Sequence, residues 1–220
     1  MTEVPPLDPA PVLWSAPPDG RAGRPLLVLL HGYGSHEGDL FGLVPHLPDE
    51  FVVAAVRAPL PPPFPTPGHS WFAIEGLHGD RSAAVTAAAE RFIEWVDAAT
   101  EHETIGLLGF SQGAVVALQA LRLQPERFAF AVNLAGYADP EPLPTDAELA
   151  RVRPPVFWGR GARDEVIPAE RVAHTALWLP EHVELSGRVY PGLTHSVSQD
   201  ELDDVVAFLR KRLDGPASRD

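Results

Sequence analysis

The sequence predicts an α/β fold with a mostly parallel central sheet and helices on both faces. Short apolar runs alternate with helical patterns along the chain. The runs are continuously apolar, which is typical of strands covered on both faces. Most of the 25 prolines lie between these runs. A chain of 220 residues can bury one substantial core, so we expect one domain over 1–220 with its folded core at about 12–213.

Seven segments are expected to form strands. Five of them are the clear apolar runs Leu26–Leu30, Phe51–Ala58, Thr104–Phe110, Phe128–Ala135 and Val183–Tyr190. A short strand is expected at Pro155–Gly159 and a weaker one at Val12–Ser15.

Four segments between the strands have helical patterns. In Arg81–Ala99, apolar residues recur at spacings of three and four, which gives the helix one buried face. The other expected helices are Gln112–Leu123, Pro168–Leu179 and Asp200–Leu213. Strand and helix therefore alternate, which favours right-handed crossovers and a ligand site beyond the carboxyl ends of the strands.

Composition excludes several classes of partner and site. With 17 basic and 30 acidic residues, the net charge of −13 would repel a nucleic-acid backbone. The chain has no cysteine, which rules out disulfides and thiolate metal sites. The N-terminus does not resemble a signal peptide, and no run approaches the ~18 apolar residues of a membrane span. We expect a cytoplasmic protein that binds no nucleic acid and inserts into no membrane.

The most informative motif is GFSQG at 109–113, where Ser111 lies between an apolar run and a helical pattern. A sharp turn from strand to helix strains the serine backbone, and small residues two positions away let the strand and the helix approach. Such a turn would expose the serine hydroxyl at the start of the helix. Ser111 is therefore a candidate nucleophile, and the alternative is an ordinary turn serine.

A serine hydroxyl needs a base to remove its proton, and the chain has nine histidines. His195 is the best placed, because it follows the last predicted strand and precedes the final helix. For most of the other histidines, a solvated or packing role is expected.

The third member of such a site is a carboxylate that orients the imidazole. Asp164 follows a predicted strand and precedes a helix, and Glu165 and Asp139 are its alternatives. The chain order Ser111, Asp164, His195 is typical of the α/β-hydrolase architecture.

Acyl transfer also needs hydrogen-bond donors for the developing oxyanion. The backbone N–H of Gln112, directly after the candidate nucleophile, is one expected donor. The other is the N–H of Tyr33 in HGYGS at 31–35, where glycines let the backbone approach a ligand. The alternative interpretation of HGYGS is a simple glycine turn after a strand.

The chain resembles the phospholipase/carboxylesterase family of α/β hydrolases, which includes acyl-protein thioesterases. Five segments carry this resemblance: HGYGSHEGDLF, HSWFAI at 69–74, GFSQG, GARDEVIP and YPGLTH. The likeness runs from about residue 25 to 212 and implies the α/β-hydrolase fold. It also implies Tyr33 and Gln112 as oxyanion donors and the triad Ser111, Asp164 and His195. We expect no cofactor and no metal. Two departures are the bulky Tyr33 and Thr194 in place of the more usual glycine before the histidine.

We expect a serine hydrolase that cleaves small soluble carboxylic esters with short-to-medium acyl groups through an acyl-enzyme, with thioesters as a second possibility. The alternatives are a peptidase of the same fold and a catalytically silent receptor for a small molecule. The sequence leaves the oligomeric state open, a homodimer included.

Two features bear on substrate size. Phe64, Trp71 and Phe72 follow a predicted strand and are expected to wall an acyl pocket, the alternative being a small core under the proline-rich loop. The connection ADPEPLPTDAELARVRP at 138–154 holds four prolines and room for one or two helical turns. We therefore expect no large cap domain and an open site.

Overall fold

The computed structural model describes residues 11–63, 65–74, 82–99 and 102–213. Its centre is a sheet with the strand order β1-β3-β2-β4-β5-β6-β7. All neighbouring strands are parallel except β1 and β3. The strands are β1 Val12–Trp14, β2 Leu26–Leu30, β3 Val52–Val56, β4 Ile105–Phe110, β5 Phe130–Leu134, β6 Pro155–Gly161 and β7 Glu184–Tyr190. The predicted mostly parallel sheet is confirmed.

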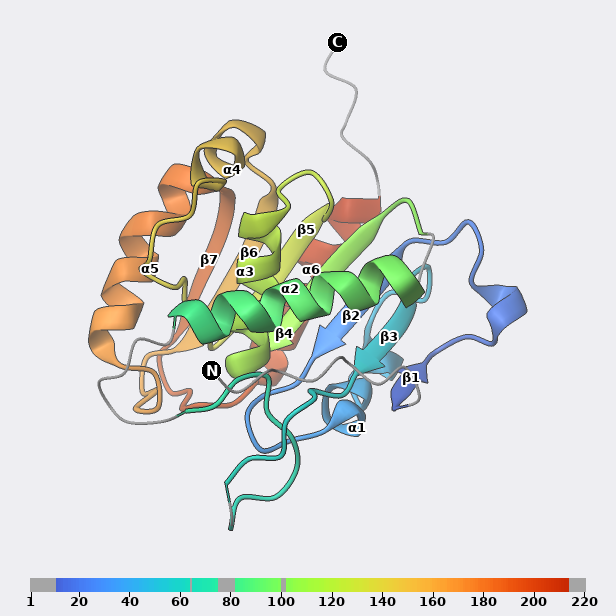
Figure 1. Cartoon of the computed structure of the whole chain (residues 1–220), viewed down its shortest axis with the longest axis horizontal. Coiled ribbons are helices and arrows are strands. Elements are labelled where there is room, and N and C mark those ends of the chain that lie inside the picture. Colours follow the sequence, from blue (N-terminus) through green and yellow to red (C-terminus); the bar gives the residue numbers. More distant parts are fainter. Residues whose placement is uncertain (1–10, 64, 75–81, 100–101, 214–220) are drawn as a thin grey trace.

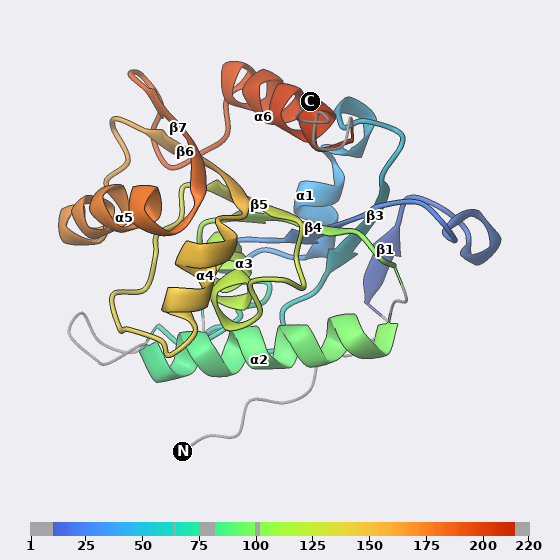
Figure 2. The same ribbon diagram turned by 90° about the horizontal axis from the view of Figure 1, so that it is seen from above.

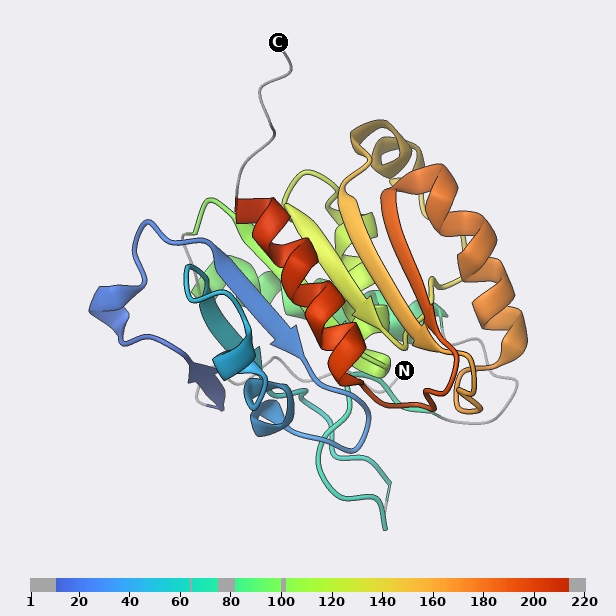
Figure 3. The ribbon, with the colours of Figure 1, turned by 180° about the vertical axis from the view of Figure 1, so that it is seen from behind.

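Helices cover both faces of this sheet. The α-helices are α1 Glu37–Phe41, α2 Ser82–Ala99, α3 Gln112–Leu123, α4 Asp146–Val152, α5 Ala169–His182 and α6 Gln199–Leu213. Two short 3₁₀ turns lie at Pro18–Gly20 and Val44–His46. Helices α2 and α3 lie in front of the sheet in Figure 1. Figure 2 shows the sheet between two helical layers, and Figure 3 shows α6 on the opposite face.

The strand residues divide between two hydrophobic clusters, one on each face. In β2, Leu26, Val28 and Leu30 pack with α2 and α3, whereas Leu27 and Leu29 pack with α6 on the other side. All five side chains are buried because successive residues of a strand point to opposite faces. This double burial is why the strand reads as a continuous apolar run.

Strand β7 does not follow this pattern. It is the last strand of the sheet, and most of its side chains are exposed or half-buried, with Val189 51% exposed. The expectation that it is covered on both faces is therefore wrong. Its sequence, ELSGRVY, carries charged residues that discourage pairing with another chain at an exposed edge.

The helix expected to end at Leu179 continues to His182, past Pro180. Its last carbonyls, which a helix leaves without intrahelical partners, are bonded by one side chain. The Arg153 guanidinium donates to the carbonyl oxygens of Pro180, Glu181 and Val183 at 2.8–3.0 Å. This distant partner, invisible in the local sequence pattern, stabilises the extra turn.

Arg122 fixes the connection between β5 and β6. Its side chain is 1% exposed and stacks on the Trp178 ring at 4.7 Å. It donates two hydrogen bonds to the carboxylate of Asp146 at 2.8 and 2.9 Å. Its other donors bond the backbone oxygens of Asp139 and Glu141 and the side chain of Gln119. One fully bonded guanidinium thus joins α3, α4 and α5.

Replacing Arg122 with alanine should lower the free energy of unfolding by roughly 3–5 kcal/mol, because it leaves a partly buried carboxylate and two carbonyls without their donor. The matched control is Arg127→Ala, which removes a more exposed ion pair with Asp97 and should cost less than about 1 kcal/mol. Urea unfolding curves of both variants test this. Equal losses in the two variants would contradict the role given to Arg122.

Candidate active site

Ser111 occupies a sharp turn between β4 and α3. Its backbone has φ 52° and ψ −118°, a strained conformation for a residue with a side chain. The turn requires glycine on both sides of the serine, because a side chain at either position would clash with the packed backbone. A Cβ at Gly109 would lie 2.5 Å from the Cα of Ala114, and one at Gly113 would lie 2.1 Å from the carbonyl oxygen of Leu30. The predicted strand-turn-helix geometry of GFSQG is therefore present.

The turn brings Ser111 into hydrogen-bond contact with His195. The Ser111 Oγ and the His195 Nε2 are 2.8 Å apart, and the His195 Nδ1 is 2.7 Å from the Asp164 Oδ2. Because a carboxylate can only accept, Nδ1 carries the shared proton and Nε2 is left to accept from the serine hydroxyl. The arrangement can take a proton from Ser111 and hold the resulting imidazolium beside a carboxylate.

Local contacts orient this trio. Asp164 Oδ1 accepts hydrogen bonds from the backbone N–H groups of Val166 and Ile167 at 2.9 and 3.2 Å, which fixes the carboxylate before α5 begins. The Phe110 ring lies 5.0 Å from the His195 ring, centroid to centroid. The side chains of Asp164 and His195 are 6% and 17% exposed, so solvent still reaches the imidazole.

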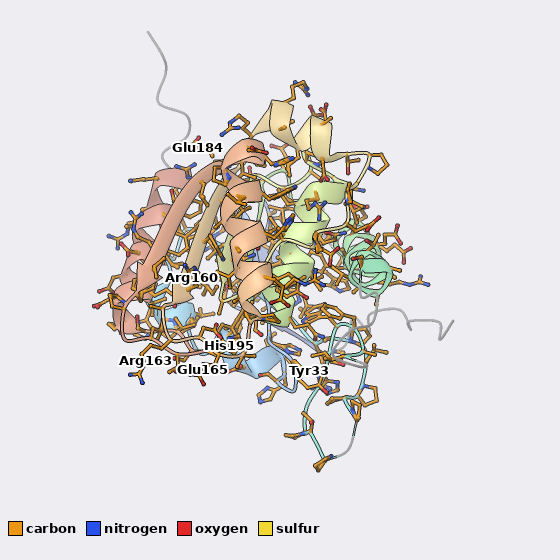
Figure 4. The ribbon with its side chains drawn as sticks, turned by 90° about the vertical axis from the view of Figure 1, so that its left-hand side faces the viewer. Tyr33, Arg160, Arg163, Glu165, Glu184 and His195 are labelled. Carbon is orange, nitrogen blue, oxygen red and sulfur yellow. The ribbon has the colours of Figure 1, made fainter. Side chains whose placement is uncertain are left out.

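The alternatives to Asp164 do not reach His195. Glu165 lies at the same edge of the molecule as His195 (Figure 4), but its side chain is exposed, and the carboxylate that bonds His195 is that of Asp164. Asp139 is buried, accepts from the backbone N–H of Glu141 and lies 3.6 Å from the Arg171 guanidinium. The geometry therefore favours Asp164 as the partner of His195.

The two expected oxyanion donors lie on segments that meet at Ser111. Gln112 is the first residue of α3, so its N–H has no intrahelical acceptor. The loop after β2 also reaches the serine: a Cβ at Gly32 would lie 3.6 Å from the Cβ of Ser111. Tyr33 follows Gly32, at the same edge of the molecule as His195 (Figure 4).

A model of the phospholipase/carboxylesterase family matches residues 17–213 of this chain. The chain belongs to the phospholipase/carboxylesterase family. Its fold is accordingly the α/β-hydrolase fold, with a short α4 and no large cap in the described residues.

Relatives in this family are esterases and thioesterases by name. Esterase YpfH from Escherichia coli is 33% identical over 204 residues, which are 86% of this chain and 84% of that protein. Acyl-protein thioesterase 1 from Kluyveromyces lactis is 33% identical over 125 residues, 54% of this chain and 55% of that protein. The match therefore spans about half the length of that thioesterase.

Solved structures of an esterase and a thioesterase have the same fold. The crystal structure of esterase PE8 matches with a TM-score of 0.68 and 28% identity, over 86% of this chain and 92% of that one. Acyl-protein thioesterase 2 from Zea mays matches with a TM-score of 0.75 and 21% identity, over 92% and 98% of the two chains. The second likeness shows a shared fold.

His31 in the family's HG motif is a buried positioning residue that the sequence did not identify. It is 1% exposed, its Nε2 accepts from the N–H of Ala58 at 3.1 Å, and its Nδ1 donates to the carbonyl oxygen of Gly32 at 2.8 Å. Burial lowers its pKa to about 4, against the opposing effect of the Gly32 hydrogen bond. The neutral ring therefore joins the loop after β2 to the end of β3.

The Gln112 side chain fixes a second loop against the site. Its Oε1 accepts from the N–H of Trp71 at 2.8 Å, and its Nε2 donates to the carbonyl oxygen of Phe72 at 2.7 Å. The indole N–H of Trp71 donates to the carbonyl oxygen of His31 at 2.8 Å. A glutamine after the serine and a histidine after β2 were visible signals, because polar residues beside buried strands need partners.

The expected acyl-pocket walls are not where they were predicted. Trp71 and Phe72 are 1% and 3% exposed and belong to the hydrophobic core that packs against α2 and α3. Trp71 meets the Phe92 ring of α2 edge-on. They are core residues, because the Gln112 hydrogen bonds draw their loop inward. Phe64 lies outside the described residues.

The described residues contain no group of three or more metal-ligating side chains placed to hold an ion. No helix among them is long and apolar enough to cross a bilayer.

Lowering the pH should destabilise the fold through His31. The pKa of His31 is about 4 in the folded state, against 6.5 for a free histidine. Between these pH values the unfolded state binds more protons, so the free energy of unfolding decreases as the pH is lowered. The loss on going below pH 4 is on the order of 3 kcal/mol. His31→Asn should remove this part of the pH dependence, measured by urea unfolding from pH 7 to pH 4. His46→Asn, at an exposed histidine, is the control, and identical pH profiles for wild type and His31→Asn would refute the assignment.

Proposed function

We propose that this protein is a serine hydrolase that cleaves small soluble carboxylic esters, and thioesters as a second class, through an acyl-enzyme. The observation that carries the proposal is the hydrogen-bonded chain from Ser111 through His195 to Asp164 on a strained turn. Family membership supports hydrolase activity of the esterase or thioesterase type.

Each residue has a defined task in this reaction. The Ser111 Oγ attacks the ester carbonyl while the His195 Nε2 takes its proton, and Asp164 stabilises the imidazolium. The N–H groups of Tyr33 and Gln112 donate to the oxyanion of the tetrahedral intermediate. His195 returns the proton to the leaving alcohol or thiol. A water molecule, deprotonated by His195, then releases the acid and restores Ser111.

The short connection after β5 supports an open site. Its helix α4 has 7 residues and is tied to the protein by Arg122, so it does not form a lid over a long acyl groove. Trp71 and Phe72 offer no surface to a chain, because they are buried. We therefore expect short-to-medium acyl groups to be preferred.

A fluorophosphonate probe should label Ser111 in the folded protein, and Ser111→Ala should lose both labelling and ester hydrolysis. Asp164→Asn should lower kcat by on the order of 10³–10⁴-fold, because the amide favours the wrong imidazole tautomer. Glu165→Gln is the matched control and should retain activity. Peptide mapping and p-nitrophenyl butyrate kinetics measure these effects. A labelled residue other than Ser111 would refute Ser111 as the nucleophile. A wild type that hydrolyses no ester would favour the peptidase if Ser111 is labelled and the silent receptor if it is not.

Acyl-chain length gives a separate test. In a series of p-nitrophenyl esters, kcat/KM should fall as the acyl chain becomes long, and the rate should show no jump when substrate passes from monomer to micelle. The reason is that the described residues place no lid over Ser111. Interfacial activation together with preference for long chains would refute the open site.

A further inference from the structure

A cavity of about 360 Å³ lies beside the hydrogen-bonded trio, between the carboxyl ends of β5 and β6 and the start of α5. Its lining includes Gly136, Arg160, Asp164, Pro168 and Val172. Its size is within the range of small-molecule sites. The cavity is therefore large enough to hold part of a substrate.

Two lining residues connect the cavity to the reacting serine. Asp164 is in direct contact with His195. Gly136 lies against α3, since a Cβ at this position would be 2.6 Å from the Cβ of Ala114, three residues after Ser111. A group bound in the cavity would therefore lie beside the hydrogen-bonded trio that would act on an ester at Ser111.

Arg160 is the unusual member of this lining. Its guanidinium lies over the Trp158 ring at 5.5 Å. Its Nε is buried and makes no hydrogen bond, and in the part of the chain that the structure describes the side chain forms no ion pair. Buried donors are nearly always bonded, so this one calls for a ligand.

Other arginines of the fold show what a satisfied guanidinium looks like. Arg122 uses all of its nitrogens, and Arg153 bonds three carbonyls. Arg160 faces a cavity in place of such partners. Glu165 also lines this cavity, but its side chain is exposed and does not pair with Arg160.

The Arg160 guanidinium favours an anion with two oxygens, against the carboxylates of Asp164 and Glu165 that also line the cavity. A guanidinium presents parallel N–H groups that match a carboxylate. The start of α5 lines the cavity too, has no side-chain cap, and adds the positive end of a 14-residue helix. Because the chain carries a net charge of −13, long-range electrostatics would not attract an anion, and any preference for one must come from this local site.

We propose that Arg160 binds a carboxylate carried by the substrate, which makes the preferred substrate an ester that also bears a free carboxylate. This inference rests on the proposed function, since the ester is cleaved at Ser111. The carboxylate can belong to the acyl group, as in a dicarboxylic acid half-ester, or to the alcohol. Arg160 is then a specificity-determining residue of this site.

The test compares matched esters that differ in charge. The probes are 4-nitrophenyl hydrogen adipate against 4-nitrophenyl hexanoate for the acyl side, and 4-carboxyphenyl butyrate against phenyl butyrate for the alcohol side. In the wild type, the ratio of kcat/KM for the charged and the neutral ester should exceed one in at least one pair. Arg160→Met should lower that ratio by roughly ten- to a hundredfold, as expected for a lost charge-assisted hydrogen bond. Arg160→Lys should give an intermediate ratio.

The matched control is Arg163→Met, which removes an equal charge from an exposed side chain that does not line the cavity. Figure 4 shows Arg163 at the outer edge of the molecule, below Arg160. This variant should keep the wild-type ratio. Ratios that are unchanged in Arg160→Met, or lowered equally in both variants, would overturn the proposal while leaving the esterase function intact.

A binding measurement separates this inference from the reaction. Monomethyl adipate should bind the Ser111→Ala protein in calorimetric titration, and the Ser111→Ala, Arg160→Met double variant should bind it at least tenfold more weakly. If the wild type hydrolyses no ester but this difference is observed, the proposed function fails and the carboxylate site stands. If the two proteins bind monomethyl adipate equally, the carboxylate site is refuted.

Discussion

The strained backbone of Ser111 is the constraint on which the rest of the site depends. A positive φ at a residue with a side chain costs roughly 1–3 kcal/mol and persists only where the surroundings hold it. Here the backbone N–H of Ser111 donates to the carbonyl oxygen of Leu134 in β5 at 2.8 Å. Gly109 and Gly113 let α3 lie directly against β4 and β2. Together these contacts point the serine hydroxyl at His195 and leave the N–H of Gln112 free.

Hydrogen bonds of buried polar groups hold the loops around Ser111 in place. Gln112 holds the loop at 70–72, whose Trp71 indole bonds His31, and His31 in turn holds the loop that leads to Tyr33. The first two steps join residues about 40 positions apart in sequence, the last joins neighbours, and every donor named in this network has an acceptor. The two expected oxyanion donors therefore sit on one connected network. In contrast, the buried Nε of Arg160 has no acceptor. Arg160 lines a cavity in which a ligand could supply one.

Parallel strands explain how residues from three parts of the chain meet. Ser111 and His195 are 84 residues apart, and Asp164 and His195 are 31 apart. Each residue follows a strand whose carboxyl end lies at the same edge of the sheet. The crossover helices on the two faces bury the strands and so fix this edge. The short α4 is tied down by Arg122, and the described residues form no folded cap over this edge.

The sequence by itself determined the alternation of strands and helices, because double burial and helical spacing leave local apolar patterns. It also determined the turn at Ser111, since only small residues permit it, and the positions of His195 and Asp164 after strands. It did not determine that Trp71 and Phe72 lie in the core, that β7 is exposed, or that α5 continues past Pro180. Those outcomes depend on distant partners: the amide of Gln112, the edge position of the strand and the guanidinium of Arg153. Local sequence patterns indicate which faces of a helix or strand are apolar. The pairing of polar groups that are distant in sequence is decided only by the tertiary structure, which brings them into contact.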